Sequence, residues 1–256
     1  MNMLSKGLAG SLLAVAAVMG AGGAQAANKP TAILVHGAFA DGSSWNQVIT
    51  RLHQAGIPVI AVQNPLSSLA DDVAVTKRAI DRVDGDVVLV GHSWAGTVIT
   101  QAGVDPKVKG LVYVAAFAPD PGQSTAALGK NYPTPPGIGK LASTQDGYLY
   151  LPDAAVKSDF APDAPAGQVA LIAASQGLIR AAAFDEPVTQ AAWQTRPSWF
   201  VVSTQDHMID PGQQLDMAKH IGARVTQVKS SHTSMVSHPD AVAKVIAEAV
   251  HAAEKP

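Results

Sequence analysis

Short apolar runs alternate with amphipathic stretches along most of the chain after residue 27. Six of these runs are rich in β-branched and aliphatic residues, and short continuous runs of this kind are typical of strands buried on both faces of a parallel sheet. They occupy residues 31–35, 58–62, 87–90, 110–114, 198–202 and 224–228. We therefore predict six strands of one mostly parallel sheet.

Most of the predicted strands are separated by stretches whose apolar residues recur at helical spacing. In residues 44–55, for example, Val48, Ile49 and Leu52 fall on one face of a helix. Similar patterns cover residues 71–83, 213–221 and 239–252, the last with proline in its first turn. Alternation of strands and helices predicts an α/β fold, with a mostly parallel sheet flanked by helices on both faces.

One long segment, about residues 120–197, interrupts this alternation. Prolines are frequent in its first half, and an alanine-rich stretch, residues 164–184, has a helical character. A connection of this length far exceeds the usual length of about two to six residues. We therefore predict that residues 27–256 form one α/β domain that carries a largely helical cap inserted at about 120–197.

The first 26 residues have the organisation of a secretory signal peptide. Lys6 supplies a positive charge, residues 8–19 form an apolar core, and Ala24-Gln25-Ala26 provides a small-x-small cleavage site. A membrane-spanning anchor needs about 20 apolar residues, and this apolar stretch is shorter and interrupted by glycine. We expect export to the periplasm or the medium after cleavage near Ala26, without a stable membrane anchor.

Composition narrows the classes of function. Of the 256 residues, 47% are hydrophobic and 15% charged, which supports a large core. The net charge is -2 and no cluster of Lys and Arg indicates a nucleic-acid partner. The chain contains no cysteine, so disulfides, a thiol nucleophile and cysteine-ligated metals are excluded. The histidines lack metal-ligand spacing, so we expect no metal.

A serine motif carries the clearest chemical signal. Gly91-His92-Ser93-Trp94-Ala95-Gly96 directly follows a predicted buried strand and opens a predicted helix. A nucleophilic serine in such a sharp strand-to-helix turn needs small residues two positions before and after it. Gly91 satisfies this requirement, whereas Ala95 stands where glycine is usual. The context favours Ser93 as a nucleophile.

This motif resembles that of the α/β-hydrolase superfamily, in particular its capped esterase and hydroxynitrile-lyase-like branch. The serine motif of that branch often reads Gly-His-Ser-aromatic-small-Gly, and the resemblance covers essentially the whole chain after residue 26. It implies that two backbone N–H groups form an oxyanion hole. One belongs to Ala38, two residues after His36 in His36-Gly37, and the other to Trp94. No cofactor is implied.

The resemblance also implies that an acid and then a histidine follow the serine along the chain. Asp206 lies four residues past the fifth predicted strand, and His232 lies in the loop after the sixth. A serine hydroxyl needs such a base, and the base needs a carboxylate to orient it. Asp210 and His238 are the alternatives. Because each precedes a proline at the start of a predicted helix, we expect them to cap or face solvent instead.

Together these residues favour an enzyme that cleaves small or medium hydrophobic carboxylic esters through an acyl-enzyme. Three aromatic residues are candidates for substrate contacts: Phe39, Phe117 and Trp193. A same-fold lyase, a cofactor-free perhydrolase or an amidase would use the same three residues. The lyase would also need a polar residue for cyanide, typically a cap lysine, for which the candidates are Lys130, Lys140 and Lys157. A non-catalytic ligand-binding protein is disfavoured because the chain keeps Ser93, Asp206 and His232.

Overall fold

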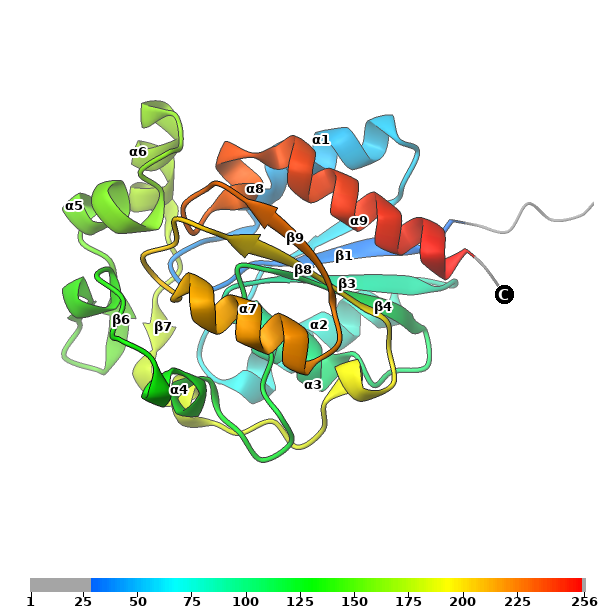
Figure 1. Cartoon of the computed structure of the whole chain (residues 1–256), viewed down its shortest axis with the longest axis horizontal. Helices are drawn as coiled ribbons and strands as arrows, with labels where there is room; N and C mark the ends of the chain where they lie inside the picture. The colour runs from blue at the N-terminus through cyan, green and yellow to red at the C-terminus, as the bar shows by residue number, and fades with distance from the viewer. Residues whose placement is uncertain (1–28, 255–256) are drawn as a thin grey trace, which may run out of the picture.

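A parallel sheet forms the centre of the computed structural model, which describes residues 29–254 (Figure 1). Over these residues the sheet has six strands in the order β2-β1-β3-β4-β8-β9, and all neighbouring pairs are parallel. The strands are β1 (Thr31–Val35), β2 (Val59–Val62), β3 (Val87–His92), β4 (Val108–Val114), β8 (Ser198–Ser203) and β9 (Arg224–Val228). The predicted α/β fold and its six strands are confirmed. The predicted signal peptide, residues 1–26, lies outside the described residues.

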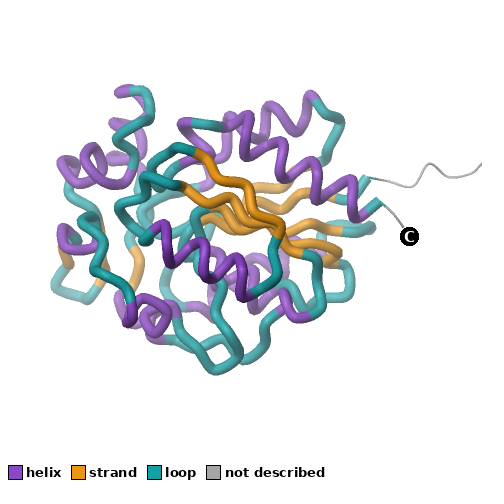
Figure 2. The backbone as a smooth tube through the Cα atoms, in the orientation of Figure 1, coloured by secondary structure: helices purple, strands orange, loops and turns teal. Residues whose placement is uncertain are grey.

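Helices cover both faces of the sheet (Figures 1 and 2). On one face lie α1 (Asn46–Gln54), α8 (Ser234–Ser237) and α9 (Pro239–Ala253), and on the other α2 (Leu69–Asp81), α3 (Ala95–Ala102) and α7 (Pro211–His220). Successive strand residues point to opposite faces. In β1, accordingly, Leu34 packs in the cluster beneath α1 and α9, whereas Ile33 packs in the cluster with α2 and α3.

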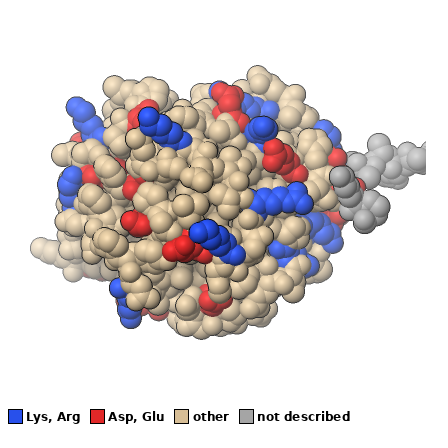
Figure 3. All heavy atoms as spheres, viewed as in Figure 1, with Lys and Arg blue, Asp and Glu red and all other residues tan. Residues whose placement is uncertain are grey.

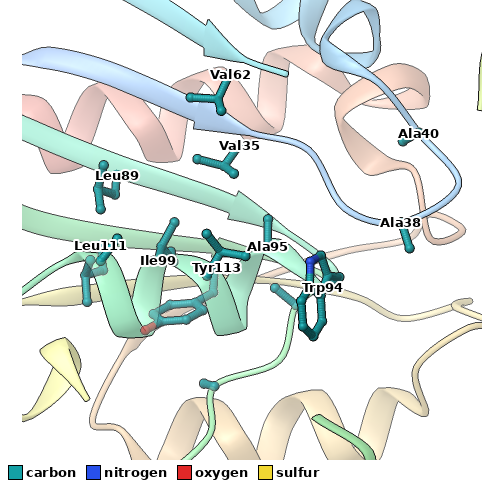
Figure 4. Packing of buried hydrophobic residues seen from close by; sticks show 14 of the residues in the cluster. Val35, Ala38, Ala40, Val62, Leu89, Trp94, Ala95, Ile99, Leu111 and Tyr113 are labelled. Atoms are coloured by element: carbon teal, nitrogen blue, oxygen red, sulfur yellow. The ribbon is translucent and has the colours of Figure 1, made fainter. Parts of the chain in front are cut away.

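The apolar cluster that includes α2 and α3 lies directly behind the serine motif. Leu89 of β3, Ile99 of α3 and Tyr113 of β4 are fully buried together in it (Figure 4). The Tyr113 hydroxyl lies 2.9 Å from Thr100 Oγ1, so its polar end has a partner within the apolar layer. This packing ties α3 firmly to the two strands at the centre of the sheet.

Residues 120–197 fold outside the central sheet, beside the ends of its strands (Figure 1). They form α4 (Thr125–Leu128), α5 (Asp153–Ala155) and α6 (Ala166–Ser175), together with several single-turn helices. They also form a small antiparallel sheet of β5 (Ala142–Ser143), β6 (Tyr148–Tyr150) and β7 (Ile179–Arg180). The proline and alanine patterns did not indicate this second sheet.

The helix expected over residues 164–184 ends at Ser175, which corrects its predicted length. The side chain of Gln176 bonds both backbone groups of Leu151, at 2.9 and 2.8 Å, and draws the chain into an extended path. A Cβ on Gly177 would lie 2.7 Å from Leu66 Cδ1. Tertiary contacts at these two residues therefore override the helical preference of the alanine-rich stretch.

Acidic and basic side chains are interspersed on the face seen in Figure 3. Among helices of the described residues, none combines the length and the apolar character that crossing a membrane requires.

The close packing of α3 against the end of β4 yields a first prediction. A Cβ on Gly96 would overlap the carbonyl oxygen of Phe117 and lie 2.9 Å from Ala116 Cβ. We expect Gly96→Ala to lower the free energy of unfolding by about 3 kcal/mol, because overpacked backbone must shift. Urea unfolding followed by circular dichroism measures this, with Gly139→Ala as control because its Cβ meets open space. Equal stability of the two variants would contradict the prediction.

Candidate active site

Ser93 occupies a strained turn between β3 and α3. Its φ is +54°, in the left-handed region that residues with a Cβ rarely adopt. Two backbone hydrogen bonds to the neighbouring strand segment hold it there. The Ser93 N–H donates to Val114 O at 3.2 Å, and the Ser93 carbonyl accepts from Phe117 N at 3.2 Å. This turn places Ser93 in the wall of a cavity.

The glycines of the motif are explained by the same turn. A Cβ on Gly91 would lie 2.6 Å from Ala95 O, and Gly96 packs against Phe117 as described above. The methyl group of Ala95, in contrast, is buried within the core without obstruction. Glycine is therefore required at positions 91 and 96, whereas alanine is accommodated at the position where the usual motif has glycine.

The predicted acid and base lie together at the ends of β8 and β9. His232 Nδ1 is 2.7 Å from Asp206 Oδ2, and both side chains are almost completely buried. A carboxylate at this distance accepts a hydrogen bond from Nδ1–H, so the lone pair of the neutral ring lies on Nε2. His232 lines the same cavity as Ser93. The structure thus brings Ser93, Asp206 and His232 to one site.

The carboxylate of Asp206 is held by further donors. Its Oδ1 accepts from the N–H groups of Met208 at 2.7 Å and Ile209 at 3.1 Å. Its Oδ2 accepts from Gln214 Nε2 at 2.7 Å, in addition to His232. These bonds fix the orientation of the carboxylate, and through it that of the imidazole. No sequence motif indicates that Gln214 holds the carboxylate of Asp206.

The alternative residues have other partners. Asp210 Oδ1 accepts from Gln213 N at 3.0 Å and so caps the start of α7. His238 Nδ1 lies 2.9 Å from Ser237 Oγ at the start of α9. Neither residue lines the cavity that contains Ser93.

Two contacts hold the loop of His232 from either side. The carboxylate of Asp163, in the 120–197 segment, accepts from Ser231 N at 2.9 Å and from the hydroxyl of Ser231. His92 Nε2 lies 3.1 Å from the carbonyl of His232, to which it can donate. Burial lowers the pKa of His92 well below its usual value, so its ring stays neutral. Neither Asp163 nor His92 was assigned a role from the sequence.

Ala38 and Trp94, the predicted oxyanion donors, follow β1 and β3 (Figure 4). Outside the helix and strand ladders, none of the backbone hydrogen bonds among residues 29–254 uses either N–H as its donor. The loop of Ala38 is fixed because Phe39 N donates to Gly177 O at 3.0 Å. Phe39 itself has a φ of +59°. Ala38 lines the cavity that contains Ser93, whereas Trp94 is buried and is not one of its lining residues.

The side chain of His36 connects two segments of the chain. Its Nε2 accepts from Asn64 N at 2.9 Å, and its Nδ1 lies 2.8 Å from the carbonyl of Gly37. Burial lowers the pKa of His36, so a neutral ring makes both contacts. His36 thereby ties the end of β1 to the segment after β2.

A buried acid that the sequence did not reveal anchors Trp94. Trp94 Nε1 donates to Asp72 Oδ2 at 2.8 Å, and Leu66 N donates to Asp72 Oδ1 at 2.8 Å. The side chain of Asp72, on α2, is fully buried, and this burial raises its pKa to about 6. One carboxylate thus holds both the indole of Trp94 and the backbone of Leu66.

The cavity has a volume of about 340 Å³ and a mostly apolar lining. Of the three aromatic candidates, Phe39 and Phe117 line it and Trp193 does not. The Trp193 indole instead donates to Pro119 O at 3.0 Å, and its ring packs edge-on against His220. The other apolar lining residues include Ile138, Leu141, Leu149, Phe184, Met208 and Ile209.

None of the three candidate lysines lines this cavity. Lys140 Nζ instead pairs with Asp159 Oδ2 at 2.6 Å, and Lys157 lies at a separate surface hollow beside α6. Within residues 29–254, no group of three or more acidic or histidine side chains is arranged to hold a metal ion.

Comparison with known proteins places this chain in a family. The model of the Alpha/beta hydrolase family matches residues 32–245. The chain belongs to this family. A probable hydrolase of Phoma sp. is 30% identical over 250 residues, which cover 86% of this chain and 98% of the relative. The chain is therefore a hydrolase.

Solved structures show the same fold at lower identity. A pyrethroid hydrolase is 20% identical with a TM-score of 0.74, covering 89% of this chain and 99% of its own. Polyneuridine aldehyde esterase is 18% identical with a TM-score of 0.76, covering 86% of this chain and 98% of its own. Proteins named as a hydrolase and as an esterase thus share this arrangement of strands and helices.

The raised pKa of Asp72 predicts a pH-dependent stability. The pKa of Asp72 is 3.8 in the unfolded chain and about 6 in the folded protein, so the folded state binds the proton more tightly. Stability from this group is therefore present below about pH 4 and lost as the pH rises through about 6. The difference between the two pKa values corresponds to up to about 3 kcal/mol in the free energy of unfolding.

Urea unfolding of the wild type and of Asp72→Asn between pH 4 and 7 tests this effect. The asparagine cannot ionise, so the stability of the wild type relative to the variant should fall by up to about 3 kcal/mol over this range. A constant difference between the two proteins would show that Asp72 does not titrate as described.

Proposed function

We propose that this hydrolase is an exported serine esterase that uses Ser93, His232 and Asp206 to cleave small or medium hydrophobic esters. The observation that carries the proposal is the buried hydrogen bond between His232 Nδ1 and Asp206 Oδ2, beside a cavity that Ser93 also lines. An imidazole held in this tautomer offers Nε2 as a base.

In the first step, His232 Nε2 takes the proton from Ser93 Oγ as the oxygen attacks the acyl carbon of the ester. Ser93 needs this base because its hydroxyl does not ionise at neutral pH. The resulting imidazolium is stabilised by the carboxylate of Asp206. The hydrogen bonds from Gln214 and from the backbone of Met208 keep the carboxylate aligned as the charge develops.

The tetrahedral oxyanion binds to the N–H groups of Ala38 and Trp94. A fixed donor of this kind contributes about 3 kcal/mol to lowering the barrier. Asp72 supports the second donor because it anchors the Trp94 indole at 2.8 Å. The strained backbone at Ser93 and Phe39 also helps to position the donors, because each of these residues lies next to one of them in the chain.

Collapse of the tetrahedral intermediate breaks the bond to the leaving alcohol, which receives its proton from His232. The acyl group then remains on Ser93 Oγ. A water molecule, deprotonated by His232, attacks this acyl-enzyme through a second oxyanion and releases the carboxylic acid. His232 returns the proton to Ser93, so the enzyme is restored with one water consumed per ester.

Three observations support an ester as the substrate. The apolar lining of about 340 Å³ suits a hydrophobic acyl or alkyl group. The cyanide-handling lysine that a lyase would need is absent from this lining, and the solved structures of similar fold include proteins named for ester cleavage. Export rests on the signal-peptide pattern of residues 1–26.

Replacement of the nucleophile tests the proposal. We expect Ser93→Ala to lower kcat/KM for short p-nitrophenyl esters by about 10⁴-fold or more, with the fold retained by circular dichroism. Ser43→Ala, which changes an exposed serine, serves as control and should retain wild-type activity. A folded Ser93→Ala protein that keeps more than a tenth of the activity would refute the assignment of the nucleophile.

A further inference from the structure

Gln213 lies in the cavity wall with an unused hydrogen-bond donor. It stands in the first turn of α7 and is one of the residues that line the cavity containing Ser93 and His232; it also lines a smaller hollow beside Asp216 and His220. The residue is only 3% exposed, and its Nε2 is buried without a hydrogen-bond partner. The start of α7 does not depend on this side chain, because Asp210 caps the backbone N–H of Gln213.

The neighbouring glutamine shows the contrast. Gln214 uses its whole amide: Nε2 donates to Asp206 Oδ2 at 2.7 Å and to Ile209 O at 3.1 Å, and Oε1 accepts from Ser203 N at 3.0 Å. The two adjacent glutamines therefore have different environments. Gln214 holds the acid, whereas Gln213 keeps a free donor beside the cavity.

The other polar groups of the lining are already accounted for. Ser93 and His232 are the proposed reacting groups. The hydroxyl of Thr125 lies 2.7 Å from that of Thr97, and Thr134 is exposed. Among the described lining residues, Gln213 is thus the buried side chain that has a donor without a partner and no part in the proposed reaction.

A buried donor without a partner is unfavourable, and an acceptor atom on a bound ligand relieves that cost. A hydrocarbon chain at the same place leaves the donor unpaired. A site that is built to hydrogen-bond a substrate atom therefore discriminates strongly against analogues that lack it. The chemistry that matches an N–H donor in an apolar wall is an oxygen acceptor within an otherwise apolar group.

We propose that the Gln213 amide determines specificity by donating to a keto or ether oxygen of the substrate, separate from the ester that is cleaved. The preferred substrates are then hydrophobic esters with a second oxygen in the acyl or alcohol chain. This inference rests on the proposed esterase function and names its substrate class.

Matched pairs of esters test the proposal. One set is p-nitrophenyl hexanoate and its analogues with an ether oxygen in place of the third, fourth or fifth carbon of the chain. The other set makes the same replacements in the alcohol of hexyl acetate. For each pair, the ratio of kcat/KM with and without the oxygen is measured in the wild type and in Gln213→Met, which has a similar length but no N–H group. Comparison of the two proteins cancels the intrinsic reactivity of the esters.

At one or more positions, the ratio should be at least tenfold higher in the wild type than in Gln213→Met. Gln168→Met, an exposed residue of α6 outside the cavity lining, is the matched control and should keep the wild-type ratio. Ratios that agree within twofold between wild type and Gln213→Met at every position overturn the proposal.

A binding measurement separates this proposal from the esterase function. Calorimetric Kd values for the same pairs are compared in Ser93→Ala and in Ser93→Ala with Gln213→Met. At least tenfold weaker binding of an oxygen-bearing ester in the double variant, with the hydrocarbon ester unaffected, supports the role of Gln213 even if the wild type hydrolyses none of the esters. Equal weakening of both ligands, or none, overturns it.

Discussion

The left-handed backbone of Ser93 is the constraint on which the rest of the site depends. A φ of +54° at a residue with a side chain persists only because the end of β4 bonds the turn from both directions. Those bonds require β3 and β4 to be neighbours, as they are in the sheet. They also require α3 to pack so closely that glycine is needed at Gly91 and Gly96. The pairing of β3 with β4, the two glycines and the position of Ser93 in the cavity wall are thus linked by one local geometry.

Parallel topology brings the remaining groups to this turn. Carboxyl ends of parallel strands meet at one edge of a sheet, where ligands bind in open α/β folds. Asp206 and His232 follow β8 and β9 at this edge, and each is restrained from outside its own loop. Gln214 on α7 holds the acid, and Asp163 in the 120–197 segment holds the residue before His232. The segment that lines the cavity is therefore coupled mechanically to the proposed base.

The strands and the proposed triad could be predicted from sequence because both depend on local patterns. Buried strands appear as apolar runs, and Ser93, Asp206 and His232 stand at fixed places relative to the ends of those runs. The residues that support the site show no such local pattern in the sequence. Asp72 lies in an ordinary amphipathic helix, and only packing shows that it bonds the indole of Trp94. Gln213 and Gln214 are adjacent and chemically identical, so only their surroundings distinguish them. The helix end at Ser175 and the position of Trp193 likewise depend on contacts with distant residues.

The central claim is that Ser93 is a nucleophile activated by the His232–Asp206 pair. The most direct test is the reaction of the folded protein with a fluorophosphonate, followed by mass mapping of the adduct, since such reagents modify an activated serine. The account predicts a single adduct, on the peptide containing Ser93, and strongly reduced labelling of His232→Ala. An adduct on another residue, or no adduct on a folded protein, would contradict it.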